Sequence, residues 1–464
     1  MERFQEYSNE IIPRLSPGAK VVGKEGTVER YDQSTAPDPI ITVFPHSEED
    51  VVEVVRYCRE KGLKCFAQTG GHSWRVKNHK TIDVVICMRG LNKVFVDEPN
   101  QTVTFGGGII VGELINAVAG KGFDVTTGLA NTVGVVGAAI YGGLGRYVGR
   151  YSHGADNLVA VNLVDSDGTI HRNVNGTTNP ELWWAIRGAG AAFGIITKAT
   201  MKIYPQTNDG LWWTCTLIFS NPSRETIEKV FKVINSTHYG DSMFVIFSFS
   251  FVPPMGYPSL VVALSFYGQE SRAEEAWERV LDPSLRPDFK QTAILPAERL
   301  NDCYDVACVT GYRRPGLAMG IERLEITAFF EIWDLWLEFG QSEDAKNSAV
   351  IMERFSKEKT LETSDEETAF SRFHRGIVYN ARNVAPTYKD AKLDQKANEF
   401  TRKVRDLLIQ KCSDPGKIRA YPTGSGQNEP LENIFNGKER VEKLLSIKKK
   451  WDPENYWGAF FDTE

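Results

Sequence analysis

A glycine-rich stretch at residues 128–145, GLANTVGVVGAAIYGGLG, constrains the fold of this chain more than any other segment. It contains six glycines, and nearly all its other residues are small or apolar. Such a stretch cannot form an ordinary amphipathic helix, and it is too apolar for a flexible linker, which would be polar. The pattern predicts a backbone that lies flat against a planar ligand, where larger side chains would collide.

A second glycine motif lies at residues 66–74, FAQTGGHSW, where a histidine and a serine follow two adjacent glycines. Paired glycines let backbone N–H groups close on a phosphate without a Cβ in the way. A plain surface turn would explain this string if it stood alone. A third loop of small residues, GAGAAFGIIT at 188–197, runs into a strand. The three loops together favour a phosphate-bearing ligand.

The segments around the second motif have regular patterns. Short apolar runs at 40–44 and 64–67 predict strands, and the stretch between them predicts a helix. Ser47 would cap that helix, with acidic residues in its first turn. The histidine loop then follows the second strand of a strand-helix-strand unit. Further strands are predicted at 84–88, 93–96, 102–105 and 159–164, and a helix after residue 108.

The pattern changes at about residue 206. Alternating segments at 212–219, 243–251 and 260–267 predict antiparallel strands, and helices are predicted at 223–235, 271–280, 342–357 and 393–412. This predicts an α+β chain with domains at 1–205 and 206–420 and a return to the first domain at 421–464. The basic residues of the last helix are expected on a solvated face: Lys438, Arg440, Lys443, Lys448, Lys449 and Lys450.

Composition excludes several classes of protein. The net charge of -6 argues against a nucleic-acid partner, which would require a basic surface. No apolar run is long enough to span a bilayer, and the first residues do not resemble a signal peptide, so we expect a cytoplasmic protein without a membrane partner. The seven cysteines are scattered without metal-ligand spacing, so no metal site is expected.

The three loops, in this order, resemble those of the vanillyl-alcohol-oxidase-type flavoproteins, which have a PCMH-type FAD-binding fold. Within that group they resemble the berberine-bridge-enzyme-like oxidases. The resemblance covers residues 40–205 closely and 440–457 more loosely. It implies an FAD-binding domain and a substrate domain built on an antiparallel sheet covered by helices. It also implies a covalent bond between His72 and the flavin 8α-methyl carbon, with the histidine loop holding the pyrophosphate.

By this resemblance, FAD would contact residues of all three loops. They are Gln68, Thr69, Gly70, Gly71, His72, Ser73, Gly128, Leu129, Thr132, Val133, Gly134, Gly137, Tyr141, Gly142, Gly143, Gly194, Ile195 and Ile196.

Departures from the family pattern refine this expectation. Relatives with a second covalent link have a cysteine where this chain has Ala130, so we expect a single link through His72. Ala138 replaces a histidine found in many relatives, and Tyr141 replaces a glycine beside the flavin. By the resemblance, Val133 occupies the position that controls oxygen access in the family, and a valine there would admit oxygen.

The catalytic base cannot be transferred from the family. Residues 420–424 match a Tyr-x-Asn-Tyr motif, but Thr423 and Gly424 replace the asparagine and the second tyrosine, which often serves as the base. Tyr141 is the first candidate for that role, and Tyr421 and Tyr379 come next.

A cationic neighbour would assist such a base. The segments 372–375 and 378–382 resemble a family strand whose alternate residues face the substrate, which would point Asn380 and Arg382 inward. An unperturbed tyrosine has a pKa near 10. The positive charge of Arg382 could lower that pKa toward the range a base needs.

These features predict an FAD-dependent oxidase. It would take hydride from a small hydrophobic or aromatic metabolite to flavin N5 and pass the electrons to dioxygen, giving hydrogen peroxide. Such oxidations can be coupled to ring closure in specialised metabolism. Three alternatives remain: a carbohydrate or alcohol oxidase with a polar groove, a non-redox cyclase that keeps FAD as a scaffold, and a binding module without catalysis.

Overall fold

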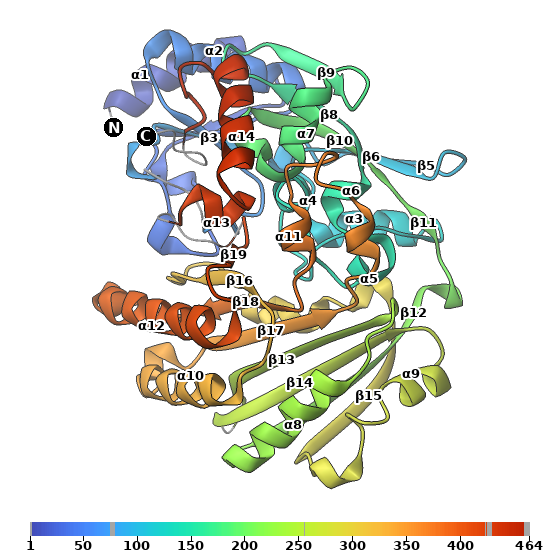
Figure 1. Ribbon diagram of the computed structural model, residues 1–464. Coiled ribbons are helices and arrows are strands. Elements are labelled where there is room, and N and C mark those ends of the chain that lie inside the picture. Colours follow the sequence, from blue (N-terminus) through green and yellow to red (C-terminus); the bar gives the residue numbers. More distant parts are fainter. Residues whose placement is uncertain (1, 75–78, 255, 423, 425–428, 459–464) are drawn as a thin grey trace.

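The protein is described by a computed structural model that covers residues 2–74, 79–254, 256–422, 424 and 429–458, without the side chains of 382 and 383 (Figure 1). An amino-terminal part, joined by the carboxyl-terminal helices, lies above a single large sheet in this view. Along the described chain, no helix is both long and apolar enough to cross a bilayer.

The amino-terminal part contains a sheet of four strands. Their order is β1 (Lys20–Val22), β2 (Ile41–Phe44), β4 (Val84–Cys87) and β3 (Cys65–Gln68), and the last three are parallel. Helix α2 (Glu48–Lys61) starts with the predicted Ser47 cap, which forms a capping box with Asp50, and its valines are buried. This is the predicted strand-helix-strand unit, with the histidine loop directly after β3. Helix α1 (Glu2–Ile11) packs beside this sheet.

A second sheet of five strands supports the glycine-rich segments. Its order is β5 (Val94–Asp97), β6 (Thr102–Gly106), β10 (Ile195–Lys202), β8 (Leu158–Val164) and β9 (Ile170–Val174). Helices α3 (Val111–Ala119), α7 (Pro180–Ala189), α13 (Leu431–Phe435) and α14 (Lys438–Trp451) bury apolar side chains against it. The glycine-rich stretch forms the short helix α4 (Val135–Ala139), followed by α5 (Val148–Tyr151) and α6 (Gly154–Asn157). Strands β7 (Phe123–Asp124) and β11 (Tyr204–Pro205) pair separately.

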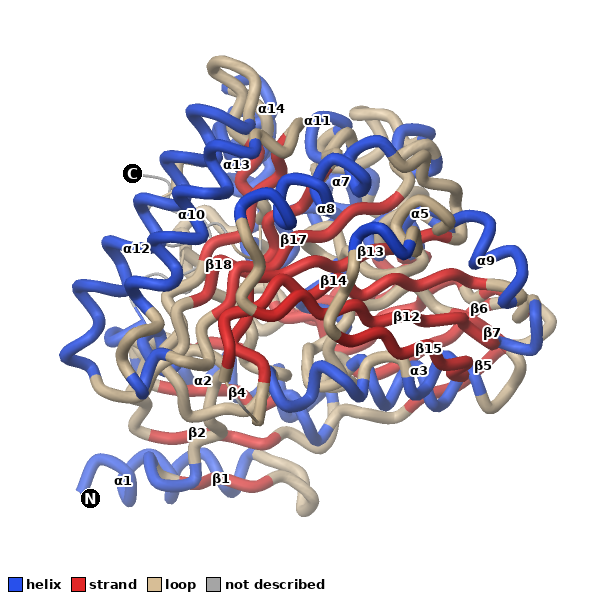
Figure 2. The backbone as a smooth tube through the Cα atoms, turned by 90° about the horizontal axis from the view of Figure 1, so that it is seen from below, coloured by secondary structure: helices blue, strands red, loops and turns tan. Residues whose placement is uncertain are grey.

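The large sheet has eight antiparallel strands. Their order is β15 (Phe289–Pro296), β12 (Leu211–Ser220), β14 (Tyr257–Tyr267), β13 (Met243–Val252), β17 (Ala349–Phe355), β18 (Tyr379–Ala385), β16 (Leu317–Ile321) and β19 (Arg419–Ala420). Helices α8 (Arg224–Ser236), α10 (Ile326–Phe339) and α12 (Asp394–Leu407) cover one face of this sheet, and α9 (Glu270–Ala276) lies at its end. Figure 2 shows α8 over the strands, and α10 and α12 next to each other at one side of the sheet. The opposite face turns toward the amino-terminal part. The α+β class is therefore confirmed.

Three local expectations were wrong. Residues 349–355 form strand β17 and not a helix, because they pair with β13 on one side and β18 on the other. The four consecutive apolar residues 349–352 are too few to show a period that separates strand from helix. Arg372–Arg375 forms a short helix, α11, and not a strand. In α14, Lys448 is buried and not solvated, since its ammonium group donates to the carbonyl oxygen of Ala192 at 2.6 Å and pairs with Asp452.

Candidate functional site

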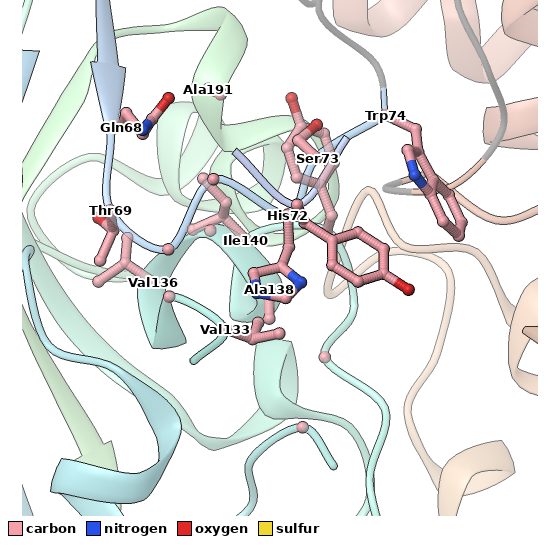
Figure 3. Close-up of a pocket in the computed structure, with 18 of the residues that line it drawn as sticks. Gln68, Thr69, His72, Ser73, Trp74, Val133, Val136, Ala138, Ile140 and Ala191 are labelled. Carbon is pink, nitrogen blue, oxygen red and sulfur yellow. The ribbon is translucent and has the colours of Figure 1, made fainter. Parts of the chain in front are cut away.

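A cavity of about 340 Å³ lies between the amino-terminal part and the large sheet. All three small-residue loops contribute to its wall, and Figure 3 shows side chains of the first two loops converging on it. Among the expected FAD contacts, the wall contains Gln68, Thr69, Gly70, Gly71, His72, Ser73, Gly128, Leu129, Val133, Gly134, Gly137, Tyr141, Gly143, Gly194, Ile195 and Ile196. Thr132 and Gly142 lie beside the described wall and not in it.

The first two loops touch through their backbones. A Cβ at Gly70 would lie 2.1 Å from the carbonyl oxygen of Thr132, so only glycine permits this approach. Gly71 has a φ of 70°, in the left-handed region that glycine adopts without strain. Thr69 anchors the turn by donating from Oγ1 to the carbonyl oxygen of Gly107 at 2.9 Å. The histidine that follows therefore has a fixed position.

The imidazole of His72 is held from two sides. Its Nε2 lies 2.9 Å from the hydroxyl of Thr132, and Tyr31 stacks on the ring with centroids 4.6 Å apart and planes at 18°. The guanidinium of Arg314 covers Tyr31 at 4.2 Å and donates to its carbonyl oxygen at 2.5 Å. These contacts fix the ring plane at the cavity wall, which is what a bond from this ring to a bound ligand would require.

Arg30 lies directly behind the histidine loop. It donates to Gln68 Oε1 at 2.9 Å and to the carbonyl oxygen of Ser73 at 2.7 Å, and it is 2% exposed. Burial lowers the pKa of the guanidinium to about 10, so it stays charged at neutral pH. A buried cation behind a loop of backbone N–H groups suits a diphosphate. The sequence patterns did not reveal Arg30, since the segment around it has no regular period.

The glycine-rich segment forms a flat, open wall. A Cβ at Gly137 would meet no atom of the described chain within 4 Å, and one at Gly128 would reach only Val111 Cγ2, at 3.9 Å. Both glycines line the cavity. Side chains there would fill the space that a planar ring needs. The residues present therefore fit FAD: Arg30 and the histidine loop would hold its diphosphate, and the glycines would leave room for its ring system.

The opposite wall comes from the large sheet and is mostly apolar. It includes Ile246 of β13, Ile351 of β17, Ala318 of β16 and Asn380 of β18. Of the tyrosines proposed as bases, Tyr141 and Tyr421 both line the cavity. The two tyrosine segments lie close together at Gly142, which has a φ of 112°. A Cβ at Gly142 would lie only 2.9 Å from the hydroxyl oxygen of Tyr421.

Tyr379 is not in the site, so that expectation was wrong. Successive side chains of a strand point to opposite faces, and Asn380 occupies the face toward the cavity. The hydroxyl of Tyr379 instead donates to Asn235 Oδ1 at 2.6 Å and accepts from Arg354 at 2.8 Å. Burial raises its pKa to about 12, which is opposite to the change that a base requires. The side chain of Arg382 and all of Thr423 lie outside the described residues.

Several wall residues were not expected from the sequence. They include Tyr31, Trp74, Leu144, Tyr304 and Cys308, together with Tyr456 and Trp457 near the end of the chain. A signal existed for Trp74 and Leu144, which fall in the two glycine motifs at 66–74 and 128–145, and for Tyr456 and Trp457, which fall in the segment that resembles the family loosely. The others come from loops whose place in the fold depends on tertiary contacts.

Comparison with known proteins agrees with this geometry. The sequence pattern of an FAD-binding domain matches residues 39–173. The FAD-linked oxidoreductase hasG of Aspergillus fumigatus is 27% identical over 437 residues, covering 92% of each chain. The FAD-linked oxidoreductase OXR2 of Pyricularia oryzae is 28% identical over 477 residues, covering 97% of this chain and 89% of the relative.

Solved structures share the whole fold. The 6-hydroxy-D-nicotine oxidase of Arthrobacter nicotinovorans has a TM-score of 0.81 at 20% identity, covering 97% of this chain and 98% of that one. The berberine-bridge-enzyme-like protein 1 of Physcomitrella patens has a TM-score of 0.80 at 20% identity, covering 97% of both. The glucooligosaccharide oxidase of Acremonium strictum, described with a 6-S-cysteinyl, 8α-N1-histidyl FAD, has a TM-score of 0.76 at 17% identity, covering 96% of this chain and 97% of that one. The resemblance noted in the sequence is therefore confirmed, and so is the expected fold.

Proposed function

We propose that this chain, an FAD-linked oxidoreductase with the fold of the berberine-bridge-enzyme-like oxidases, oxidises a small, largely hydrophobic or aromatic metabolite with dioxygen as the electron acceptor. One observation carries the proposal: a single cavity is bounded by the glycine wall on one side and by the apolar face of the large sheet on the other. A substrate bound against the sheet would thus lie next to the ring system of the cofactor.

The chemistry would be divided between cofactor and protein. Bound FAD would supply the hydride acceptor at N5 and would pass the two electrons on to dioxygen, giving hydrogen peroxide. The protein holds the ring of His72 through Thr132 and Tyr31, places the charge of Arg30 behind the diphosphate loop, and excludes water with apolar side chains. Tyr141 and Tyr421 remain the candidates for taking a proton from the substrate.

We propose one covalent link, through His72. The contacts of Thr132 and Tyr31 hold the imidazole at the cavity wall. Ala130 is 5% exposed and lines the same cavity, and it offers no sulfur for a second link. The FAD named for the glucooligosaccharide oxidase of Acremonium strictum has a cysteinyl and a histidyl link. In this chain we expect only the histidyl link.

The wall favours an apolar substrate over a carbohydrate. Within the part of the wall that the structure describes, Arg30 is the only lysine, arginine, aspartate or glutamate, and it lies at the diphosphate loop. Near the large sheet the wall contains Ile246, Ile351 and Ala318, which cannot pair with the hydroxyl groups of a sugar. Chitooligosaccharide and xylooligosaccharide oxidases share the fold, so a sugar substrate remains the second candidate.

An anaerobic titration tests the function. The purified protein is mixed without oxygen with candidate aromatic metabolites and, in parallel, with oligosaccharides. We expect an aromatic compound to bleach the yellow flavin, and readmitted oxygen to restore the colour with one hydrogen peroxide per flavin. Bleaching by oligosaccharides alone would show that the protein is a carbohydrate oxidase and would contradict the proposed aromatic substrate. Conversion of substrate without bleaching would identify a non-redox cyclase.

A further inference from the structure

Asn380 places a polar side chain in the otherwise apolar part of the cavity wall. It lies on β18, directly opposite Glu353 on β17 and Gly320 on β16. Asn380 is 2% exposed and Glu353 is fully buried. The amide nitrogen of Asn380 donates to Glu353 Oε2 at 3.0 Å. The pair is therefore a cross-strand contact made inside the protein.

The amide oxygen of Asn380 is left for the cavity. It is buried, and no donor of the described chain reaches it. A buried carbonyl oxygen without a donor lowers stability unless a ligand supplies the missing hydrogen bond. Turning the amide by 180° does not help, since the oxygen would then face the carboxylate oxygen of Glu353 and the donated bond would be lost. Glu353 thus fixes which end of the amide faces the substrate.

We propose that Asn380 Oδ1 accepts a hydrogen bond from an O–H or N–H group of the substrate, and that Glu353 is the positioning residue for this contact. The inference rests on the proposed function and narrows its substrate class to apolar or aromatic molecules that carry such a donor. The surrounding Ile246, Ile351 and Ala318 would contact the apolar body. A site built around one buried acceptor discriminates against analogues that lack the donor, because the acceptor then stays unpaired.

Asn380 binds the donor and does not remove its proton. An amide oxygen accepts hydrogen bonds but is not a base at neutral pH. The contact would orient the donor group, leaving any proton transfer to Tyr141 or Tyr421.

Binding of two matched probes tests the proposal. 2-Naphthol and 2-methoxynaphthalene have the same ring system, but only the first carries a donor. Each is titrated into the FAD-loaded enzyme while the flavin absorbance is followed, and no turnover is needed. We expect the wild type to bind 2-naphthol about tenfold or more tightly than its methyl ether. In Asn380→Leu this ratio should fall to about one.

A second variant tests the positioning role. Glu353→Gln has nearly the same size, but a glutamine can donate to Asn380 Oδ1 and allow the amide to turn its nitrogen toward the cavity. We expect its preference for 2-naphthol to fall at least about fivefold, whether or not Asn380→Leu folds. Ile351→Val, on the same wall and without a polar atom, should change both affinities by similar factors.

Three results would overturn the proposal: an unchanged preference in both polar variants, no preference in the wild type, or no binding of either probe. A clear preference in an enzyme that no metabolite reduces would instead refute the oxidase function and leave the assignment of Asn380 intact.

Discussion

Replacing Gly137 by leucine is expected to stabilise the protein without FAD and to weaken FAD binding. Gly137 lies inside helix α4, and apart from its chain neighbours and its own helix backbone a Cβ there would meet no described protein atom within 4 Å. Glycine is a poor helix residue and leucine a good one, so the change should raise the free energy of unfolding of the FAD-free protein by roughly 0.7 kcal/mol.

With FAD the effect should reverse. Gly137 lines the cavity, so the leucine side chain would occupy part of the space that the cofactor ring needs. A ligand at 100 times its dissociation constant stabilises the folded state by about 2.7 kcal/mol. If the leucine weakens binding about 100-fold, the same FAD concentration stabilises the variant by only about 0.4 kcal/mol.

The assay uses the His72→Ala background, from which FAD can be removed. Urea unfolding is measured with and without FAD for the background protein and for the additional Gly137→Leu change. Gly240→Ala is the matched control, since a Cβ at Gly240 also meets open space but lies outside the cavity wall. Equal stabilisation of the leucine variant and the background by FAD would refute the placement of the cofactor beside α4.

Three further predictions follow from single side chains. Val133→Leu should slow reoxidation of the reduced flavin by oxygen and leave its reduction by substrate nearly unchanged. Equal effects on both half-reactions would mean that Val133 only packs against its neighbours. Tyr141→Phe should slow anaerobic flavin reduction by about 10² or more if this tyrosine takes the proton, and a loss below tenfold would exclude it and leave Tyr421. Arg375→Met should lower the free energy of unfolding at pH 7 by about 3–5 kcal/mol, because it leaves the carboxylate of Asp156 buried without its partner. Burial opposes ionisation of Asp156, but Arg375 outweighs it and holds the pKa below the ordinary value. The wild type therefore keeps this contribution above the ordinary aspartate pKa of about 3.9 and loses it as the pH falls further toward the lowered pKa of Asp156. The gap between variant and wild type in urea unfolding should narrow from about pH 4 to about pH 2; a constant gap over that range would contradict the pairing.

The sequence was sufficient for the parts of the fold that depend on local patterns. The capping box at Ser47, the strand before the histidine loop and the three glycine loops all have signals within a few residues, and each lies where expected. The limit was reached at Ala349–Phe355, where only four consecutive residues are apolar and the segment is too short to show a period that distinguishes a strand from a helix.

Parts of the site depend on contacts between distant residues, which no local pattern contains. Arg30 reaches the histidine loop only because the amino-terminal segment folds back over β3. The register of β18 against β17 decides that Asn380 faces the cavity. The neighbouring Tyr379 therefore points to the other side of the sheet and lies outside the site. Lys448 was misjudged because its partner Ala192 comes from a different part of the chain.

The most direct test of the account is to locate the flavin on the protein. The purified protein is denatured in acid and digested, and its peptides are analysed by mass spectrometry. The account predicts one FAD, attached to the peptide that contains His72, and no flavin on the peptide that contains Ala130. The His72→Ala variant should release its flavin on denaturation. A wild-type protein whose flavin is released by acid, or a flavin attached at another residue, would contradict it.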